Sequence, residues 1–363
     1  MKEPFLKTLD FYFIKKFLGT FLYSIALIVS IAIVFDISEN LDEFLSKDAS
    51  FHDIFVDYYL NFIPYFANLF SSLFTFISVI YFTSKLAADS EIIAILSSGV
   101  SFPRLMRPYM VSALMIALFT YTMGNFIIPP ANQKRIEFKN KYFRNGVNNY
   151  QQNIHNQLVP GTYIYMKSYN TSNDVGYQFT MEKFENGKLS SKLESKYIKW
   201  DREKKNWVIH DYVIRKIEGQ KETLTSGAEI DTTLNMKPED YRMFKNIMET
   251  MTLPKLNSEI KELKMKGVST IEFEIEKYRR LADSFASFIL TLIGASLASK
   301  KIKGGIGMHL GFGLLISFSY ILFMQISTVF ASSGSVSPAI AVWIPNIIFG
   351  VLAIYLYRGA CRR

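Results

Sequence analysis

The sequence has few residues of the kinds that cross-link a fold or bind metals, with one cysteine and four histidines in 363 residues. Because Cys361 is the only cysteine, no intramolecular disulfide can hold the fold together. The histidines are His52, His155, His210 and His309, and none has another histidine, cysteine or glutamate at zinc-ligand spacing. A disulfide framework is excluded, and a zinc site is not expected.

Two catalytic signatures are also missing from the sequence. It contains no GxxxxGK[ST] phosphate loop, so it has no recognisable ATP site and any ATP-driven work must be powered by a partner. It contains no GxSxG motif of the serine hydrolases. We therefore do not expect an enzyme, and we expect no cofactor in this chain.

Charged residues are absent from long stretches, although the chain carries 41 Lys+Arg and 32 Asp+Glu. The 54 residues of 304–357 include no Asp, Glu, Lys or Arg. A membrane-spanning helix needs only about 20 apolar residues. With a composition that is 49% hydrophobic, a water-soluble protein is excluded.

Uncharged runs mark the expected membrane crossings, because a charged residue at the centre of a spanning helix costs roughly 2.5 to 3.5 kcal/mol. The longest run divides in two at the turn-forming residues 332–338. The six expected spans are 17–35, 58–84, 108–133, 284–299 and two within 304–357.

Orientation follows from the basic residues beside the short loops. Thirteen Lys and Arg residues lie on one side of the expected spans and only Lys47 lies on the other. Because cytoplasmic loops are enriched in Lys and Arg, this asymmetry places both termini in the cytoplasm. The polar stretch between the third and fourth spans is then external.

This external stretch, 134–283, holds 27 basic and 21 acidic residues, as an ordinary folded domain would. Aromatic and β-branched runs at 161–169, 177–184 and 207–215 alternate in part and predict strands. Residues 253–266 carry apolar side chains at helical spacing. We expect a small β sandwich or jelly roll followed by a helix that returns to the membrane.

The cytoplasmic loop after the second span predicts a short helix. Asp89 and Ser90 can cap its start, and Gly99 can end it after Ser98. Apolar residues in this helix exceed what a solvated loop requires, namely Ile92, Ile93, Ile95 and Leu96. Such a surface indicates a docking element for a cytoplasmic protein. A helix lying on the lipid surface is the alternative.

Ion-coupled transporters need ionisable groups at membrane depth, and few are present. Asp283 is interpreted as an interfacial residue beside Arg279 and Arg280, and His309 as a packed polar group. These interpretations disfavour ion-coupled transport.

Three separated motifs resemble one known family. Ser-Glu-Ile-Ile-Ala-Ile-Leu-Ser-Ser-Gly-Val-Ser at 90–101 resembles the cytoplasmic coupling segment of the LptF/LptG (YjgP/YjgQ) permeases. Residues 276–307 resemble the fourth span of that family, its basic turn and the start of the fifth span, and Ala-Val-Trp-Ile-Pro-Asn at 341–346 resembles its sixth span.

The resemblance implies an α-helical membrane protein with six transmembrane helices (3+3) and a periplasmic β-jellyroll domain inserted between helices 3 and 4. Residues 1–133 would hold helices 1–3, with a coupling helix near 86–99. The periplasmic domain and return helix would occupy 134–278, and helices 4–6 would occupy 279–363. The expected location is the bacterial inner membrane, with both termini cytoplasmic.

The resemblance also implies a role in lipopolysaccharide export. Members of the family are membrane subunits of an ABC transporter that extracts lipopolysaccharide from the inner membrane. A paralogous LptF or LptG permease, an LptB-type ATPase dimer that binds ATP and Mg, and LptC- and LptA-type periplasmic proteins are the implied partners. No nucleic acid is expected as a partner.

Expected site residues fall into three groups. Those that couple to the ATPase are Glu91, Ile92, Ala94, Leu96, Ser98 and Gly99. Those on the lipid path are Leu22, Ile25, Phe179 and Leu314. Acidic residues occupy the outer end of the first span, where the family often has basic ones, so the possible lipid-phosphate contacts are Lys134, Arg135, Lys277, Arg279 and Arg280.

Two other functions compete with lipid export. An envelope scaffold or sensor would transport nothing, and the cytoplasmic helix with Glu91 argues against it. A mechanical-coupling ABC subunit would pull on a partner without passing lipid, but such subunits usually place the large domain after the first of four spans.

Overall fold

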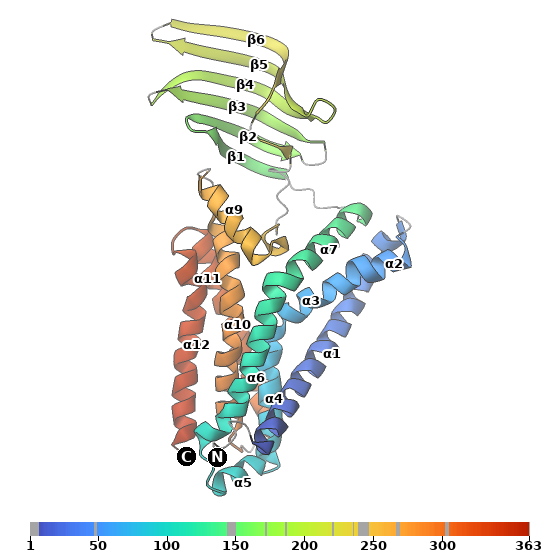
Figure 1. The fold of residues 1–363 in the computed structure, drawn as a ribbon, viewed down its shortest axis with the longest axis vertical. Helices are drawn as coiled ribbons and strands as arrows, with labels where there is room; N and C mark the ends of the chain where they lie inside the picture. The colour runs from blue at the N-terminus through green and yellow to red at the C-terminus, as the bar shows by residue number, and fades with distance from the viewer. Residues whose placement is uncertain are drawn as a thin grey trace, which may run out of the picture. The chain divides into compact units, whose positions relative to one another are not determined.

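The structure is a computed structural model, which describes residues 7–46, 49–143, 150–170, 173–185, 187–219, 221–234, 236–238, 247–265, 269–301 and 305–362. The chain divides into two compact units (Figure 1). The membrane unit comprises Met1–Phe138, Glu249–Leu253 and Ile271–Arg363, and the β unit comprises Lys139–Met248 and Pro254–Thr270.

The membrane unit is helical. Its elements are α1 (Thr8–Ser46), α2 (Phe51–Asp53), η1 (Ile54–Tyr59), α3 (Leu60–Leu69), α4 (Ser71–Ala88), α5 (Glu91–Ser97), α6 (Phe102–Thr122), η2 (Met123–Ile127), α7 (Ile128–Tyr142, whose last turn enters the β unit), η3 (Ile247–Thr250, whose first two residues belong to the β unit), α10 (Ile271–Ala298), α11 (Gly305–Ser332) and α12 (Pro338–Cys361). Six stretches are long and apolar enough to cross a membrane: Thr8–Leu45, Ser71–Ala88, Phe102–Tyr142, Ile271–Ala298, Gly305–Ser332 and Pro338–Cys361. The predicted number of spans is confirmed.

The second span differs from the prediction of one continuous helix over 58–84. The helix breaks at Phe70, whose backbone angles are φ −91° and ψ 0°. Pro64 lies within α3 and cannot donate a backbone hydrogen bond to the preceding turn. Only α4 meets the length and composition of a span here. The uncharged run gave no sign of the break, because apolar residues continue through it.

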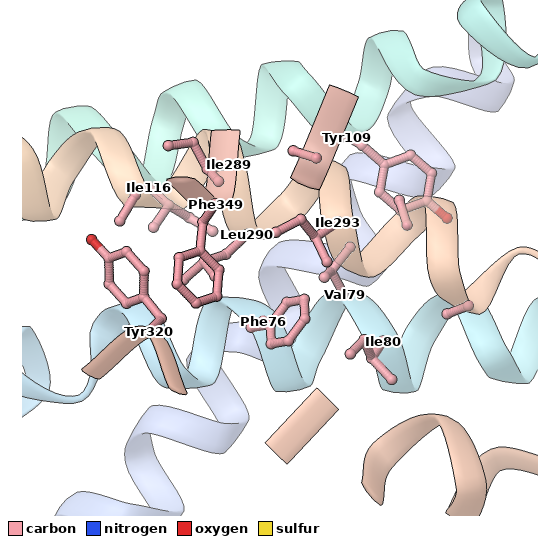
Figure 2. Close-up of a cluster of buried hydrophobic side chains, with 14 of the residues drawn as sticks. Phe76, Val79, Ile80, Tyr109, Ile116, Ile289, Leu290, Ile293, Tyr320 and Phe349 are labelled. Carbon is pink, nitrogen blue, oxygen red and sulfur yellow. The ribbon is translucent and has the colours of Figure 1, made fainter. Parts of the chain in front are cut away.

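Helix α10 forms the centre of the membrane unit, where it contacts α4, α6, α11 and α12. Gly294 permits the close approach of α4, because a Cβ atom there would lie 2.3 Å from a methyl carbon of Val79. Leu290 and Ile293 of α10 point into the same cluster as Val79 and Phe76 of α4 (Figure 2). This tight packing fixes the helices that surround the candidate sites.

Helix α1 packs on the unit by one face only. Phe13, Phe17 and Phe21, spaced four residues apart, are buried against α4 and α6. Most of its other large apolar side chains are exposed, including Leu22 at 60%. This bare surface suits contact with lipid or with another transmembrane helix.

The β unit contains one antiparallel sheet. Its strands are β1 (Tyr150–Val159), β2 (Thr162–Asn170), β3 (Val175–Glu185), β4 (Lys188–Asp201), β5 (Asn206–Glu218) and β6 (Lys221–Thr232), and each pairs with the next along the chain. The three predicted strands lie in β2, β3 and β5.

The predicted jelly roll is corrected to an up-and-down meander. A jelly roll has two sheets with Greek-key crossovers, whereas the six described strands form a single sheet in the order of the sequence. Short turns impose this order: Gly161 and Gly187, both with positive φ, lie in the turns β1–β2 and β3–β4, and residues 202–205 join β4 to β5.

One face of the sheet carries the core of the β unit. Phe179, Ile198 and Trp207 are fully buried there. Leu234 and Met236, which follow β6, cover this face, and the indole Nε1 of Trp207 donates a hydrogen bond of 3.0 Å to the carbonyl of Met236. The apolar face is therefore closed by the chain itself.

The predicted return helix is present as α9 (Leu253–Met265). Its buried residues are those at helical spacing in the sequence: Leu256, Ile260 and Leu263. Gly267, which the sequence favours as the C-cap of this helix, lies outside the described residues.

Candidate functional site

The short helix predicted after the second span exists as α5, close to its predicted bounds. Ser90 precedes it with a left-handed backbone (φ 62°), and Gly99 follows it with φ 91°. The side chain of Ser90 makes no capping hydrogen bond to the helix. Instead, the Lys301 ammonium, from the turn after α10, donates to Ser90 Oγ at 3.2 Å and to the Ala88 carbonyl at 3.0 Å. The start of α5 is thus tied to the turn that follows α10.

The structure corrects which face of α5 is available for docking. Ile92 is 1% exposed and belongs to the core of the membrane unit, with Leu96 partly buried beside it. Ile93, by contrast, is 50% exposed. Ile92 therefore anchors α5 to its own subunit, and Ile93, which belongs to the predicted apolar surface but not to the expected coupling residues, is the large apolar side chain that a partner could contact.

The other predicted coupling residues surround this exposed position. Ala94, Ser98 and Gly99 are exposed and Glu91 is half-buried. The free surface of α5 therefore combines a carboxylate, one large apolar side chain and several small residues. A complementary pocket on a partner could accept Ile93 while a basic or hydrogen-bonding group faces Glu91.

A buried ion pair connects the segment after α5 to α1. The Arg104 guanidinium donates two hydrogen bonds, of 2.7 and 2.6 Å, to the two carboxylate oxygens of Asp10. The backbone N–H of Lys7 also donates to Asp10, at 2.7 Å. The sequence gave no signal for this pair, because its members are 94 residues apart.

Replacing Asp10 with asparagine is expected to destabilise the membrane unit. Asp10 is 2% exposed. Each hydrogen bond to a charged group contributes about 1.5–3 kcal/mol to the free energy of unfolding. A fall in the midpoint of thermal denaturation would report the loss, whereas Glu39→Gln, an exposed carboxylate on the same helix, should leave it unchanged. Equal midpoints for the Asp10 variant and wild type would contradict a structural role for the pair.

The predicted lipid-path residues divide by accessibility. Leu22 of α1 and Leu314 of α11 are exposed, at 60% and 40%, while Ile25 packs partly against the core. Phe179 is 0% exposed. The expectation that acyl chains pass between two sheets at Phe179 is corrected, because the six strands form one sheet and its apolar face is covered.

The predicted lipid-phosphate contacts differ in their exposure and in their partners. Lys134 is exposed and Lys277 partly so, and the guanidinium of Arg135 lies 4.4 Å from the ring centre of Tyr65. Both remaining candidates bind the buried Glu276 carboxylate, which accepts from Arg279 at 2.6 Å and from Arg280 at 2.8 Å; Arg280 also donates to the Met251 carbonyl at 2.8 Å.

Arg280 therefore serves the fold, because it fixes the returning segment Glu249–Leu253 to α10.

The acidic outer end of the first span is also built into the fold. Asp36 accepts hydrogen bonds of 3.0 Å from the hydroxyl groups of Tyr58 and Tyr59. These contacts join α1 to η1, and they explain how an acidic residue is accommodated where a basic one was expected from the resemblance.

Comparison with known protein families identifies the family of this chain. Residues 11–359 match the family described as lipopolysaccharide export system permease LptF/LptG. The chain belongs to the LptF/LptG family. A search of curated proteins finds no match.

Family membership makes the chain a membrane subunit of a lipopolysaccharide export permease, a transporter component that is not itself an enzyme. The match spans α5 and all six apolar helices. Like other LptF/LptG permeases, the protein is a multi-pass inner-membrane protein.

Proposed function

We propose that this chain is one half of an ABC transporter that extracts lipopolysaccharide from the inner membrane and passes it to a periplasmic bridge towards the outer membrane. The observation that carries the proposal is α5, a helix fixed to its subunit by Ile92 and presenting Ile93 and Glu91 outward. Such an element is what a permease without an ATP site needs in order to receive force from a separate ATPase.

The partners follow from the family. An LptB-type ATPase dimer binds ATP and Mg and docks on α5, and a paralogous LptF or LptG subunit completes the membrane part. The exposed surfaces of α1 and α11, at Leu22 and Leu314, suit a passage lined by two such subunits. LptC- and LptA-type proteins receive the lipid from the periplasmic β unit.

In the proposed topology, three spans precede the β unit and three follow it, and both termini are in the cytoplasm. Within the membrane unit, the start of α1 and the end of α12 lie at the same end as α5 (Figure 1). Docking of a cytoplasmic ATPase on α5 therefore requires both termini to be cytoplasmic, in agreement with the distribution of Lys and Arg.

Cys361 offers a direct check of this topology, because it is an exposed thiol at the end of α12. A membrane-impermeant maleimide should not label it in intact spheroplasts and should label it after the membrane is permeabilised. A Cys361→Ser variant controls for labelling elsewhere. Efficient labelling before permeabilisation would contradict the proposed orientation.

The function itself is tested by purification and reconstitution. The chain should copurify in mild detergent with an ATPase and a second permease. Liposomes containing that complex should release lipopolysaccharide to an added periplasmic acceptor when ATP is supplied. A scaffold would recover no ATPase, and a mechanical-coupling subunit would hydrolyse ATP without releasing lipid, so either result would refute the proposal.

A further inference from the structure

A cavity of about 230 Å³ lies inside the membrane unit. Part of its wall comes from α3 and α7, which lie towards the end of this unit opposite α5 (Figure 1). Segments α3, α4, α6, η2, α7, η3, α10 and α11 contribute to its wall. Its volume is several times the roughly 30 Å³ that one water molecule occupies in the liquid. The space can therefore hold a polar group of several heavy atoms.

Charges of both signs line this cavity. They are Glu249, Glu276, Arg279, Arg280 and Asp283. Glu276 is satisfied by the two arginines. Among the residues that the structure describes, none donates a hydrogen bond to the carboxylate of Glu249 or Asp283. Burial, and next the Glu276 carboxylate, raise the pKa of Glu249, so a positive group in the cavity would favour its charged form.

Unpaired polar atoms are aimed into the same space. Asn132 is 1% exposed and lines the cavity, and neither its Nδ2 nor its Oδ1 has a hydrogen-bond partner among the described residues. Ser71 Oγ and Asn68 Oδ1 are also buried without a hydrogen-bond partner among the described residues. Because unsatisfied buried polar groups cost free energy, these donors and acceptors favour binding of a ligand that offers both.

The cavity opens to the lipid-facing surface. Leu69 of α3 and Ile321 of α11 line it and are 56% and 39% exposed. Asp283 directly precedes the uncharged run 284–299, so under the proposed topology the cavity lies near the level of the outer headgroups. A lipid could place its headgroup inside and its acyl chains along these apolar side chains.

We infer that the cavity binds the headgroup of a zwitterionic phospholipid that carries a phosphate and a primary ammonium. Asp283, Glu249 and the Asn132 oxygen receive the ammonium N–H groups, while Arg279, whose side chain is 41% exposed and forms an ion pair with Glu276, faces the phosphate. Arg135 adds a further positive charge beside Tyr65, which balances the three carboxylates.

A metal cation would leave the Asn132 Nδ2 without an acceptor, and a free anion would leave the carboxylates of Glu249 and Asp283 without a donor. The zwitterion satisfies both sets. The level of this site in the membrane rests on the proposed topology.

Native mass spectrometry of the full complex tests the inference, with phosphatidylethanolamine, phosphatidylcholine and phosphatidylglycerol of identical acyl chains as probes. Phosphatidylethanolamine should bind roughly tenfold more tightly than either other lipid, because charge-assisted hydrogen bonds from its ammonium are lost in both. Equal binding of the three lipids, or binding of none, would overturn the inference. Stabilisation by Na⁺ alone without lipid would overturn it as well.

Variants locate the site. Asp283→Asn and Asn132→Ala should reduce phosphatidylethanolamine binding to the level of phosphatidylcholine, whereas Glu272→Gln, an exposed carboxylate on the same helix, should not. Unchanged selectivity in Asp283→Asn would refute the assignment. If that variant does not assemble, the contrast among lipids in the wild type decides. Lipopolysaccharide-stimulated ATP hydrolysis, measured in parallel, reports separately on the proposed function.

Discussion

Glu91→Lys is expected to abolish lipopolysaccharide-stimulated ATP hydrolysis and to weaken recovery of the ATPase with the permease. Glu91 lies at the start of α5, half-buried and next to the exposed docking face. Loss of one partner in a buried charge pair at an interface costs about 2–5 kcal/mol, which corresponds to roughly 30-fold weaker assembly or more. ATPase rates and subunit stoichiometry in the reconstituted complex measure the effect.

Two neighbouring isoleucines supply the matched controls. Ile93→Asp should disrupt ATPase docking while the permease remains folded, because Ile93 is half-exposed. Ile92→Ala should instead lower the thermal stability of the permease, since truncation of a buried isoleucine costs about 2–5 kcal/mol. Wild-type stoichiometry and rates in both Glu91→Lys and Ile93→Asp would show that the ATPase docks elsewhere.

The elements predicted correctly from the sequence are those with local signals. Helix α5 follows from its position between Ser90 and Gly99. Both residues take left-handed backbone angles, Ser90 just before the helix begins and Gly99 just after it ends. The strand around Trp207 follows from aromatic and β-branched composition. The transmembrane helices follow from missing charge, which requires no knowledge of their neighbours.

Features that depend on distant contacts could not be predicted in this way. Ile92 and Ile93 are identical in type, and only the packing of α5 against the core distinguishes them. Strand signals do not specify pairing, so a meander and a jelly roll share them. Asp283 stands near two arginines in sequence, yet both donate to Glu276, which leaves Asp283 facing a cavity.

The covered face of the sheet leads to a second large effect. A photo-crosslinker at Phe179 should capture lipopolysaccharide only when ATP is hydrolysed, because Phe179 is fully buried beneath the cover formed by Leu234 and Met236. Crosslinkers at Leu22 and Leu314 should capture it without ATP, since both side chains are exposed on the membrane unit. Lipopolysaccharide adducts on gels quantify each case.

The hydrogen bond from Trp207 to the Met236 carbonyl provides the means to test the cover itself. Trp207→Phe keeps an aromatic ring but leaves that carbonyl without its donor, a loss of about 1–3 kcal/mol that should raise ATP-independent capture at Phe179 by roughly tenfold.

A crosslinker at Thr180, the next residue on β3, should capture little lipid, because successive strand residues point to opposite faces. Equal capture at Phe179 with and without ATP in the wild type would show that the cover does not gate the sheet. Equal capture at Thr180 and Phe179 would show that lipid does not select the apolar face. A route along that face therefore requires two results together: dependence on ATP at Phe179, and loss of that dependence when the Trp207 donor is removed.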